Sequence, residues 1–216
     1  SHAHLDHSGM LPRLYHEGFR GVIYCTRATA ELLDVMLHDS VGLYLRDLER
    51  TTRRNARRGR PEIEPVFDIE DVEGVLGLCS GHGFKEHVPV GEAATLVFHD
   101  AGHILGSASA ELKLEPADSP DALRMLFSGD LGPDEKTFHP EPDAPEGFDY
   151  IVCESTYGDR DREDYTLEKR RDALREELRR GLARGGNVVI PSFAVERSQE
   201  LLHDIGVLLT RREIPD

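Results

Sequence analysis

The first seven residues, Ser-His-Ala-His-Leu-Asp-His, constrain this chain more than any other segment. His2 and His4 alternate along the backbone, so both imidazoles can point to the same side. Asp6 and His7 follow directly and can reach a second centre nearby. Neutral imidazole and carboxylate together suit zinc, and also manganese or iron. A purification tag would be a monotonous run of histidines, so this mixed run predicts a metal site.

Metal ligands need rigid support, and a ligand-dense turn normally follows the end of a strand. This sequence opens on the ligands, with no methionine and no strand before them. We therefore expect the chain to be a piece of a longer protein. Its 216 residues suffice for one large domain, or for one domain and part of another.

Two later loops carry further candidate ligands. His103 lies in the glycine-bracketed loop Asp-Ala-Gly-His-Ile-Leu-Gly-Ser-Ala, between strands expected at 94–98 and 108–114. Asp130 follows a strand expected at 124–127, in Phe-Ser-Gly-Asp-Leu-Gly. A lone histidine or aspartate in a turn is usually a cap or a solvated side chain. Because each loop follows a strand, however, the loops can converge with the opening run at one edge of a sheet, and this favours a shared metal site.

The rest of the chain alternates between helical and strand patterns. Helices are expected over 8–18, 28–48, 69–78, 167–183 and 194–209, and further strands over 21–26, 150–153 and 188–190. This order indicates an α/β protein whose second domain begins near residue 159, which divides the chain into 1–158 and 159–216.

Composition excludes some classes of protein. The three cysteines form no CxxC pair, so they indicate neither a disulfide framework nor a thiolate zinc site, and a reducing cytoplasm fits best. No stretch has the apolar length of a membrane span, so we expect no membrane partner. The net charge of −15 counts against nucleic-acid binding unless positive charge is local. Basic residues do cluster, at Arg50, Arg53, Arg54, Arg57, Arg58 and Arg60. We expect a solvated loop there, with phosphate contact as the less favoured alternative.

The segments HAHLDH, GHILGSA and SGDLG, in this order and spacing, resemble the metallo-β-lactamase superfamily. The resemblance implies an αββα sandwich, here without its first strands, and a dinuclear metal site with zinc as the first choice and manganese as the alternative. The first metal would be held by His2, His4 and His103, the second by Asp6 and His7, with Asp130 bridging the two. The family's pattern has one more metal histidine, beyond residue 216.

The segment Cys-Glu-Ser-Thr-Tyr-Gly-Asp-Arg at 153–160 resembles the first signature of the β-CASP nucleases, the branch that includes ribonuclease J and RNA 3′-end processing endonucleases. Residues 185–202 resemble the start of the α/β cap domain of that branch. The resemblance implies hydrolysis of single-stranded RNA by a metal-activated water, with catalytic roles for two carboxylates. Asp6 would orient the water or accept its proton, and Glu154 would hold a histidine of the cap domain.

Two other functions stay open. A small-molecule hydrolase of this fold, acting on a thioester, ester or lactone, would share residues 2–130 but would not continue into a cap domain. A non-catalytic scaffold would usually have lost metal ligands, and all six are present here. Glu154 could also be an ordinary strand-end carboxylate that caps a turn. Neither the substrate-binding residues nor the oligomeric state follow from these patterns.

Overall fold

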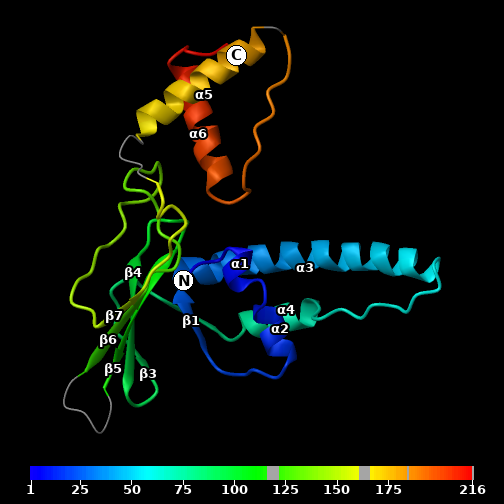
Figure 1. The fold of residues 1–216 in the computed structure, drawn as a ribbon, viewed down its shortest axis with the longest axis vertical. Coiled ribbons are helices and arrows are strands. Elements are labelled where there is room, and N and C mark those ends of the chain that lie inside the picture. The colour runs from blue at the N-terminus through cyan, green and yellow to red at the C-terminus, as the bar shows by residue number, and fades with distance from the viewer. Residues whose placement is uncertain (116–121, 161–165, 184, 216) are drawn as a thin grey trace.

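The structure is a computed structural model of the chain, and it describes residues 1–115, 122–160, 166–183 and 185–215 (Figure 1). Helices and strands alternate in a mixed α/β fold. In chain order the elements are α1 (Leu5–Ser8), α2 (Leu11–His16), β1 (Ile23–Thr26), α3 (Arg27–Ala56), α4 (Ile69–Leu76), β2 (Cys79–His82), β3 (Val88–Val90), β4 (Ala94–Asp100), β5 (Ala108–Leu114), β6 (Leu123–Phe127), β7 (Tyr150–Val152), α5 (Leu167–Leu182) and α6 (Arg197–Thr210). None of the described helices combines the length and apolar character needed to cross a membrane.

The larger sheet places three loops at the same edge. Its strand order is β3-β4-β5-β6-β7, and every pairing is antiparallel except that of β6 with β7. Asp100 at the end of β4 pairs with Ala108 at the start of β5, and Phe127 at the end of β6 pairs with Ala110. The backbone N–H of Ala108 also donates to the carbonyl oxygen of Ser1 over 2.8 Å. The opening run, the loop after β4 and the turn after β6 therefore meet.

The chain also contains a second, smaller sheet and the long helix α3. Strands β1 and β2 pair in parallel. The buried side chains of α3 pack with those of α4 in one apolar core, which contains Ala3, Leu33, Leu37, Val41, Phe67, Val72 and Val75. Because Ala3 belongs to this core, the metal-ligand run is anchored to α3. Strands β2 and β3 were not expected from the sequence, since Cys-Ser-Gly-His has no apolar run and Val-Pro-Val is interrupted by a proline.

Two expectations from the sequence are wrong. The helix expected to end at 48 continues to Ala56, because no proline or glycine occurs between residue 48 and Gly59. Arg50, Arg53 and Arg54 therefore lie on a helix and not in a loop. The strand expected at 188–190 is absent: these residues are described, but they pair with no described strand, and Val189 is 88% exposed. An apolar run without a neighbouring strand to pair with has no partners for its backbone hydrogen bonds.

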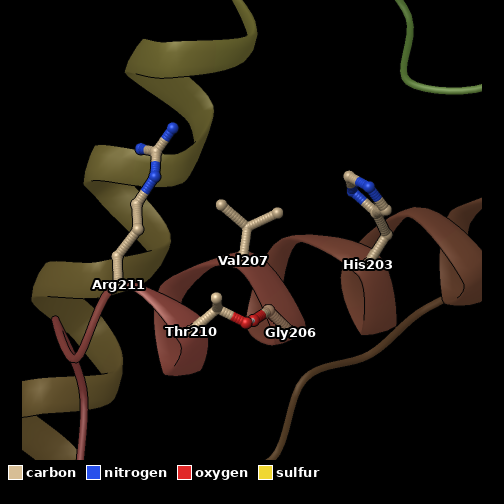
Figure 2. Close-up of a pocket in the computed structure, with 5 residues that line it drawn as sticks. All are labelled: His203, Gly206, Val207, Thr210 and Arg211. Carbon is tan, nitrogen blue, oxygen red and sulfur yellow. Dashed lines mark hydrogen bonds between the residues drawn. The ribbon is translucent and has the colours of Figure 1, made fainter.

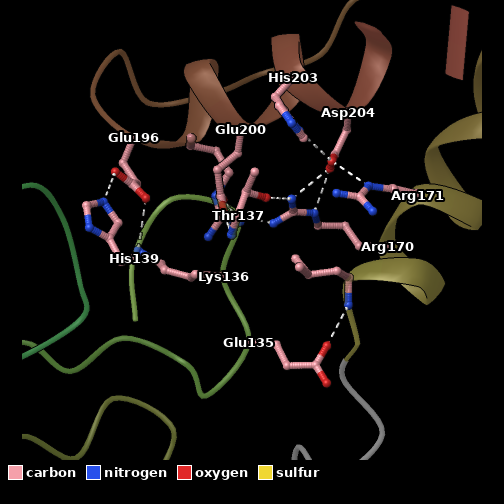
Figure 3. Close-up of polar contacts among 12 residues, drawn as sticks. Glu135, Lys136, Thr137, His139, Arg170, Arg171, Glu196, Glu200, His203 and Asp204 are labelled. Atoms are coloured by element: carbon pink, nitrogen blue, oxygen red, sulfur yellow. Dashed lines mark hydrogen bonds and ion pairs between the residues drawn. The ribbon is translucent and has the colours of Figure 1, made fainter. Parts of the chain in front are cut away.

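Helices α5 and α6 share a small core of Leu178, Leu208 and Ile214. The loop that follows Asp130 is tied to these helices by hydrogen bonds (Figure 3). The backbone N–H of Leu167 donates to Glu135 over 3.1 Å, and that of Thr137 to Glu200 over 3.4 Å. The guanidinium of Arg170 donates to the Thr137 hydroxyl over 2.9 Å. Successive residues of one loop thus bind both helices.

Behind these contacts lie buried ion pairs. The carboxylate of Asp204, which is 1% exposed, is 2.7 Å from Arg170 and 2.8 Å from Arg171. Glu200, equally buried, is 3.1 Å from Arg170. We call this group the docking cluster: Glu135, Thr137, Arg170, Arg171, Glu200 and Asp204.

Candidate metal centre

The six side chains that the sequence nominates as ligands lie together at the sheet edge. We call them the histidine cluster: His2, His4, Asp6, His7, His103 and Asp130. They come from the opening run, the loop between β4 and β5, and the turn after β6. Their ligand atoms form two groups, and within each group all of them lie within 4.8 Å of one another. Asp130 belongs to both groups.

The first group is the more buried. His4 Nδ1 lies 3.1 Å from His2 Nε2 and 3.2 Å from His103 Nε2. The Oδ2 atom of Asp130 lies 3.7 Å from the Nε2 atoms of His2 and of His103. A tetrahedral zinc ion with bonds of about 2.0–2.1 Å holds its ligand atoms about 3.3 Å apart. These four atoms therefore fit around one such ion.

The second group is more open. His7 Nε2 lies 3.2 Å from Asp130 Oδ1 and 3.7 Å from Asp6 Oδ2. The two oxygens of Asp130 thus face different groups. The side chain of Asp6 is 76% exposed, so this group faces solvent. An ion held by three protein atoms here would keep a position for water or substrate, as catalytic metal sites do.

His2, His4 and His103 favour their neutral form. Burial, and then the nearby His7, His103 and His4, lower the pKa of His2 to about 3. Burial also lowers the pKa of His4 and of His103. Imidazoles that stay neutral near pH 7 keep a free lone pair, which is the form that binds a metal ion.

The loop that carries His103 is held by short hydrogen bonds. The backbone N–H groups of His103 and of the next residue donate to the Ser107 hydroxyl over 2.9 and 3.1 Å. The hydroxyls of Thr26 and Thr29, at the start of α3, donate to the carbonyl oxygen of Gly106 over 2.6 and 2.8 Å. Gly106 has a φ of +77°, and a Cβ there would lie 2.6 Å from the Thr29 nitrogen. Only glycine therefore fits this close approach.

Glu154 braces the turn that carries Asp130. Its carboxylate accepts hydrogen bonds from the backbone N–H of Leu131 over 2.8 Å and of Thr156 over 3.1 Å. Burial raises the pKa of Glu154, but the hydrogen bonds from Thr156 and Leu131 outweigh it and lower the pKa overall. An ionised carboxylate thus fixes the residue next to Asp130. This contact matches the turn-capping role that the sequence left open for Glu154.

Comparison with known proteins gives relatives that share one biochemical theme. No family model matches the chain. Ribonuclease TTHA0252 of Thermus thermophilus is 40% identical over 203 residues, covering 94% of this chain and 41% of that protein. An RNase J-like protein of Methanocaldococcus jannaschii is 31% identical, covering 94% and 41%. The transcription termination factor FttA of Methanothermobacter thermautotrophicus is also 31% identical, covering 94% and 29%.

The chain is similar, over almost its whole length, to β-CASP members of the metallo-β-lactamase superfamily. It spans about two-fifths of the length of the two ribonuclease-named β-CASP relatives and less than a third of the length of FttA. The resemblance expected from the sequence is therefore confirmed, and it runs through almost all of this chain.

Lys136 contacts the loop that carries His103, and it was not predicted from the sequence. Its ammonium group donates to the carbonyl oxygen of His103 and lies 3.3 Å from Glu196 Oε1. Glu196, the residue before α6, also lies 2.8 Å from His139 through its other oxygen. These contacts join residues 33 and 60 positions apart in the chain. No local pattern signals such pairing.

The hollows on the surface lie apart from the ligand atoms. One of about 450 Å³ lies on α6 and is lined by His203, Gly206, Val207, Thr210 and Arg211 (Figure 2). Its one arginine is paired with Glu168 over 3.2 Å. Another, of about 310 Å³, lies beside the start of α3 and the His103 loop. Neither of these two hollows is lined by a residue of the histidine cluster.

Proposed function

We propose that the intact protein is a metal-dependent ribonuclease that hydrolyses phosphodiester bonds of single-stranded RNA in the cytoplasm. One observation carries the proposal: the two oxygens of Asp130 face two separate groups of metal-ligand atoms. The names of the relatives, ribonuclease and RNase J-like protein, support RNA as the substrate.

The proposal includes the architecture. Residues 1–158 form most of an αββα metallo-β-lactamase domain, and residues 159–216 begin an α/β cap domain. The docking cluster supports this arrangement, because it binds the loop after Asp130 to α5 and α6. A cap bound at this loop leaves a groove in which a single strand is selected.

We assign six ligands to two divalent ions, with zinc as the first choice and manganese as the alternative. The first ion would be held by His2, His4 and His103, the second by Asp6 and His7, and Asp130 would contribute one oxygen to each group. Imidazole and carboxylate donors suit either metal. When bound, two such ions lower the pKa of a shared water and neutralise charge on the phosphate.

Two carboxylates act beside the ligands. Asp6 is the most exposed member of its group, so it can orient the attacking water or accept its proton. Glu154 holds the backbone beside Asp130, and so keeps the shared carboxylate between the two groups of ligand atoms. In the complete cap domain Glu154 also orients a histidine. Loss of a side chain that supports the metal ligands without being one typically lowers activity or metal affinity by ten- to a hundredfold.

A substrate comparison tests the proposal. The intact protein is supplied with zinc or manganese and assayed on single-stranded RNA, single-stranded DNA of the same sequence, and a thioester. We expect RNA cleavage that Asp130→Ala abolishes. Rapid thioester cleavage with RNA left intact would overturn the ribonuclease assignment and favour a small-molecule hydrolase. Absence of any hydrolysis with both metals bound would favour a scaffold.

A further inference from the structure

The far end of α3 carries a dense basic surface that the proposed metal site does not use. We call residues 46–60 the basic segment. It has seven arginines, which are Arg46, Arg50, Arg53, Arg54, Arg57, Arg58 and Arg60, against two acids, so its net charge is +5. The whole chain carries −15, so the remaining residues carry −20. All seven arginines are exposed.

These arginines are poorly neutralised by their neighbours. Arg53 is 2.6 Å from Glu49, and Arg50 is 3.6 Å from Asp47. In the part of the chain that the structure describes, the other five form no ion pair. Two glutamates follow at 62 and 64, beyond the end of the helix. A concentrated positive field thus remains on a strongly acidic protein.

The helix aligns part of this charge. Arg46, Arg50, Arg53 and Arg57 recur at intervals of four, three and four residues, which places them on one face of α3. At 100° per residue, the buried positions Leu33, Leu37 and Val41 fall on the opposite face. The arginines therefore point away from the apolar core, and packing within the described residues does not account for them.

The basic segment lies at one end of α3, and the other end of this helix supports the candidate metal site. The two are therefore far apart. The first turn of α3 holds the His103 loop through Thr26 and Thr29. A rise of 1.5 Å per residue puts Arg46 about 29 Å, and Arg57 about 45 Å, along the axis from that turn. Figure 1 shows the end of α3 extending beyond α2 and α4. One polymer could contact both places only if it were long.

We propose that the basic segment binds the phosphate backbone of a single-stranded RNA at a distance from the bond that is cleaved. The inference rests on the proposed ribonuclease function for the identity of the polymer. Guanidinium groups pair with phosphates through parallel hydrogen bonds, and such contacts position a strand without reading its sequence. The surface thus makes the enzyme favour long RNA over short RNA.

The test compares two substrate lengths in the intact protein. A tetranucleotide, which spans about 14 Å when stacked, cannot reach from the metal site to Arg46, whereas a thirty-nucleotide strand can. The variant Arg57→Gln/Arg58→Gln removes two charges that make no ion pair. The control Arg179→Gln/Arg212→Gln removes the same charge from exposed positions at the other end of the chain. Binding of fluorescent RNA, measured by anisotropy in EDTA, needs no hydrolysis.

We expect the test variant to bind the thirty-nucleotide RNA about tenfold more weakly at low salt. The slope of its salt dependence should fall by about 0.7 for each phosphate that the variant no longer neutralises. Hydrolysis of the tetranucleotide and kcat on the long strand should stay unchanged. Glu49→Gln should tighten binding of the long strand, which a folding defect could not do.

Three results would overturn the inference: equal loss on both substrate lengths, an equal effect of the control variant, or binding of polyglutamate in place of RNA. Because binding is read without cleavage, an inactive protein that still binds long RNA through these arginines would refute the proposed function and leave the basic segment assigned.

Discussion

The histidine cluster and the docking cluster both place ionisable side chains close together, but only the docking cluster pairs its buried carboxylates with arginines. Around Asp204 and Glu200, each buried carboxylate faces a guanidinium group at 2.7–3.1 Å. In the histidine cluster, three imidazoles face one another at 3.1–3.2 Å, and burial lowers their pKa values. Imidazoles and carboxylates that converge with no arginine or lysine among them favour a site for a cation, whereas buried carboxylates paired with guanidinium groups indicate a structural contact.

The largest effect is expected from removing the carboxylate that the two ligand groups share. Asp130→Ala should lower the rate of RNA hydrolysis by at least about a thousandfold, because ligands that act as a unit fail together. Single-turnover assays would measure it. The exposed Asp134, four residues further on, provides the control, and Asp134→Ala should retain activity. A loss of less than tenfold in Asp130→Ala would contradict the assignment.

Substitutions in the docking cluster should lower the stability of the fold and should not change the chemical step. Asp204→Ala leaves two arginines without their buried partner, so we expect the free energy of unfolding to fall by about 3–5 kcal/mol. Asp172→Ala, at an exposed pair with Arg175, should cost no more than about 1 kcal/mol. Urea unfolding compares the two. Equal effects would show that the docking cluster is not a structural contact.

We expect substitution of Glu154 to have an intermediate effect on activity. Its carboxylate binds the backbone beside Asp130, but it is not among the candidate metal ligands. Glu154→Ala should leave the metal content unchanged and lower kcat about ten- to a hundredfold. Glu154→Gln should recover part of the loss, since one amide oxygen can still accept the hydrogen bond from Leu131. The exposed Glu141 serves as the control position. Loss of metal in Glu154→Ala would indicate that Glu154 is itself a ligand.

The smallest effect concerns pH in the metal-free protein. The pKa of His2 is about 3 in the fold, because of its burial, against an ordinary value of 6.5. As the pH falls, His2 is protonated in the unfolded chain at a higher pH than in the folded protein. The free energy of unfolding should therefore decrease as the pH drops below about 6.5. Melting temperatures in EDTA between about pH 7.5 and 5.5 would measure this slope. His2→Gln should flatten it, and His87→Gln, at an exposed position, should not.

The convergence of the six candidate ligands could be predicted because each lies in a short motif next to a strand end. HAHLDH, GHILGSA and SGDLG needed only the sheet to bring them together, and β4, β5 and β6 form close to the expected ranges. Lys136 could not be predicted, since its contacts with His103 and Glu196 depend on tertiary packing. The strand expected at 188–190 failed for a related reason. Apolar character alone supplies no neighbouring strand.

Metal content tests the central claim most directly, because the comparison of the two clusters depends on whether the histidine cluster binds cations. The intact protein is loaded with zinc and dialysed, and its metal content is measured by inductively coupled plasma mass spectrometry. We predict two equivalents of metal in the wild-type protein and in His87→Ala, and no more than one retained by Asp130→Ala. A wild-type protein that holds no metal, or an Asp130→Ala protein that still holds two equivalents, would contradict the account.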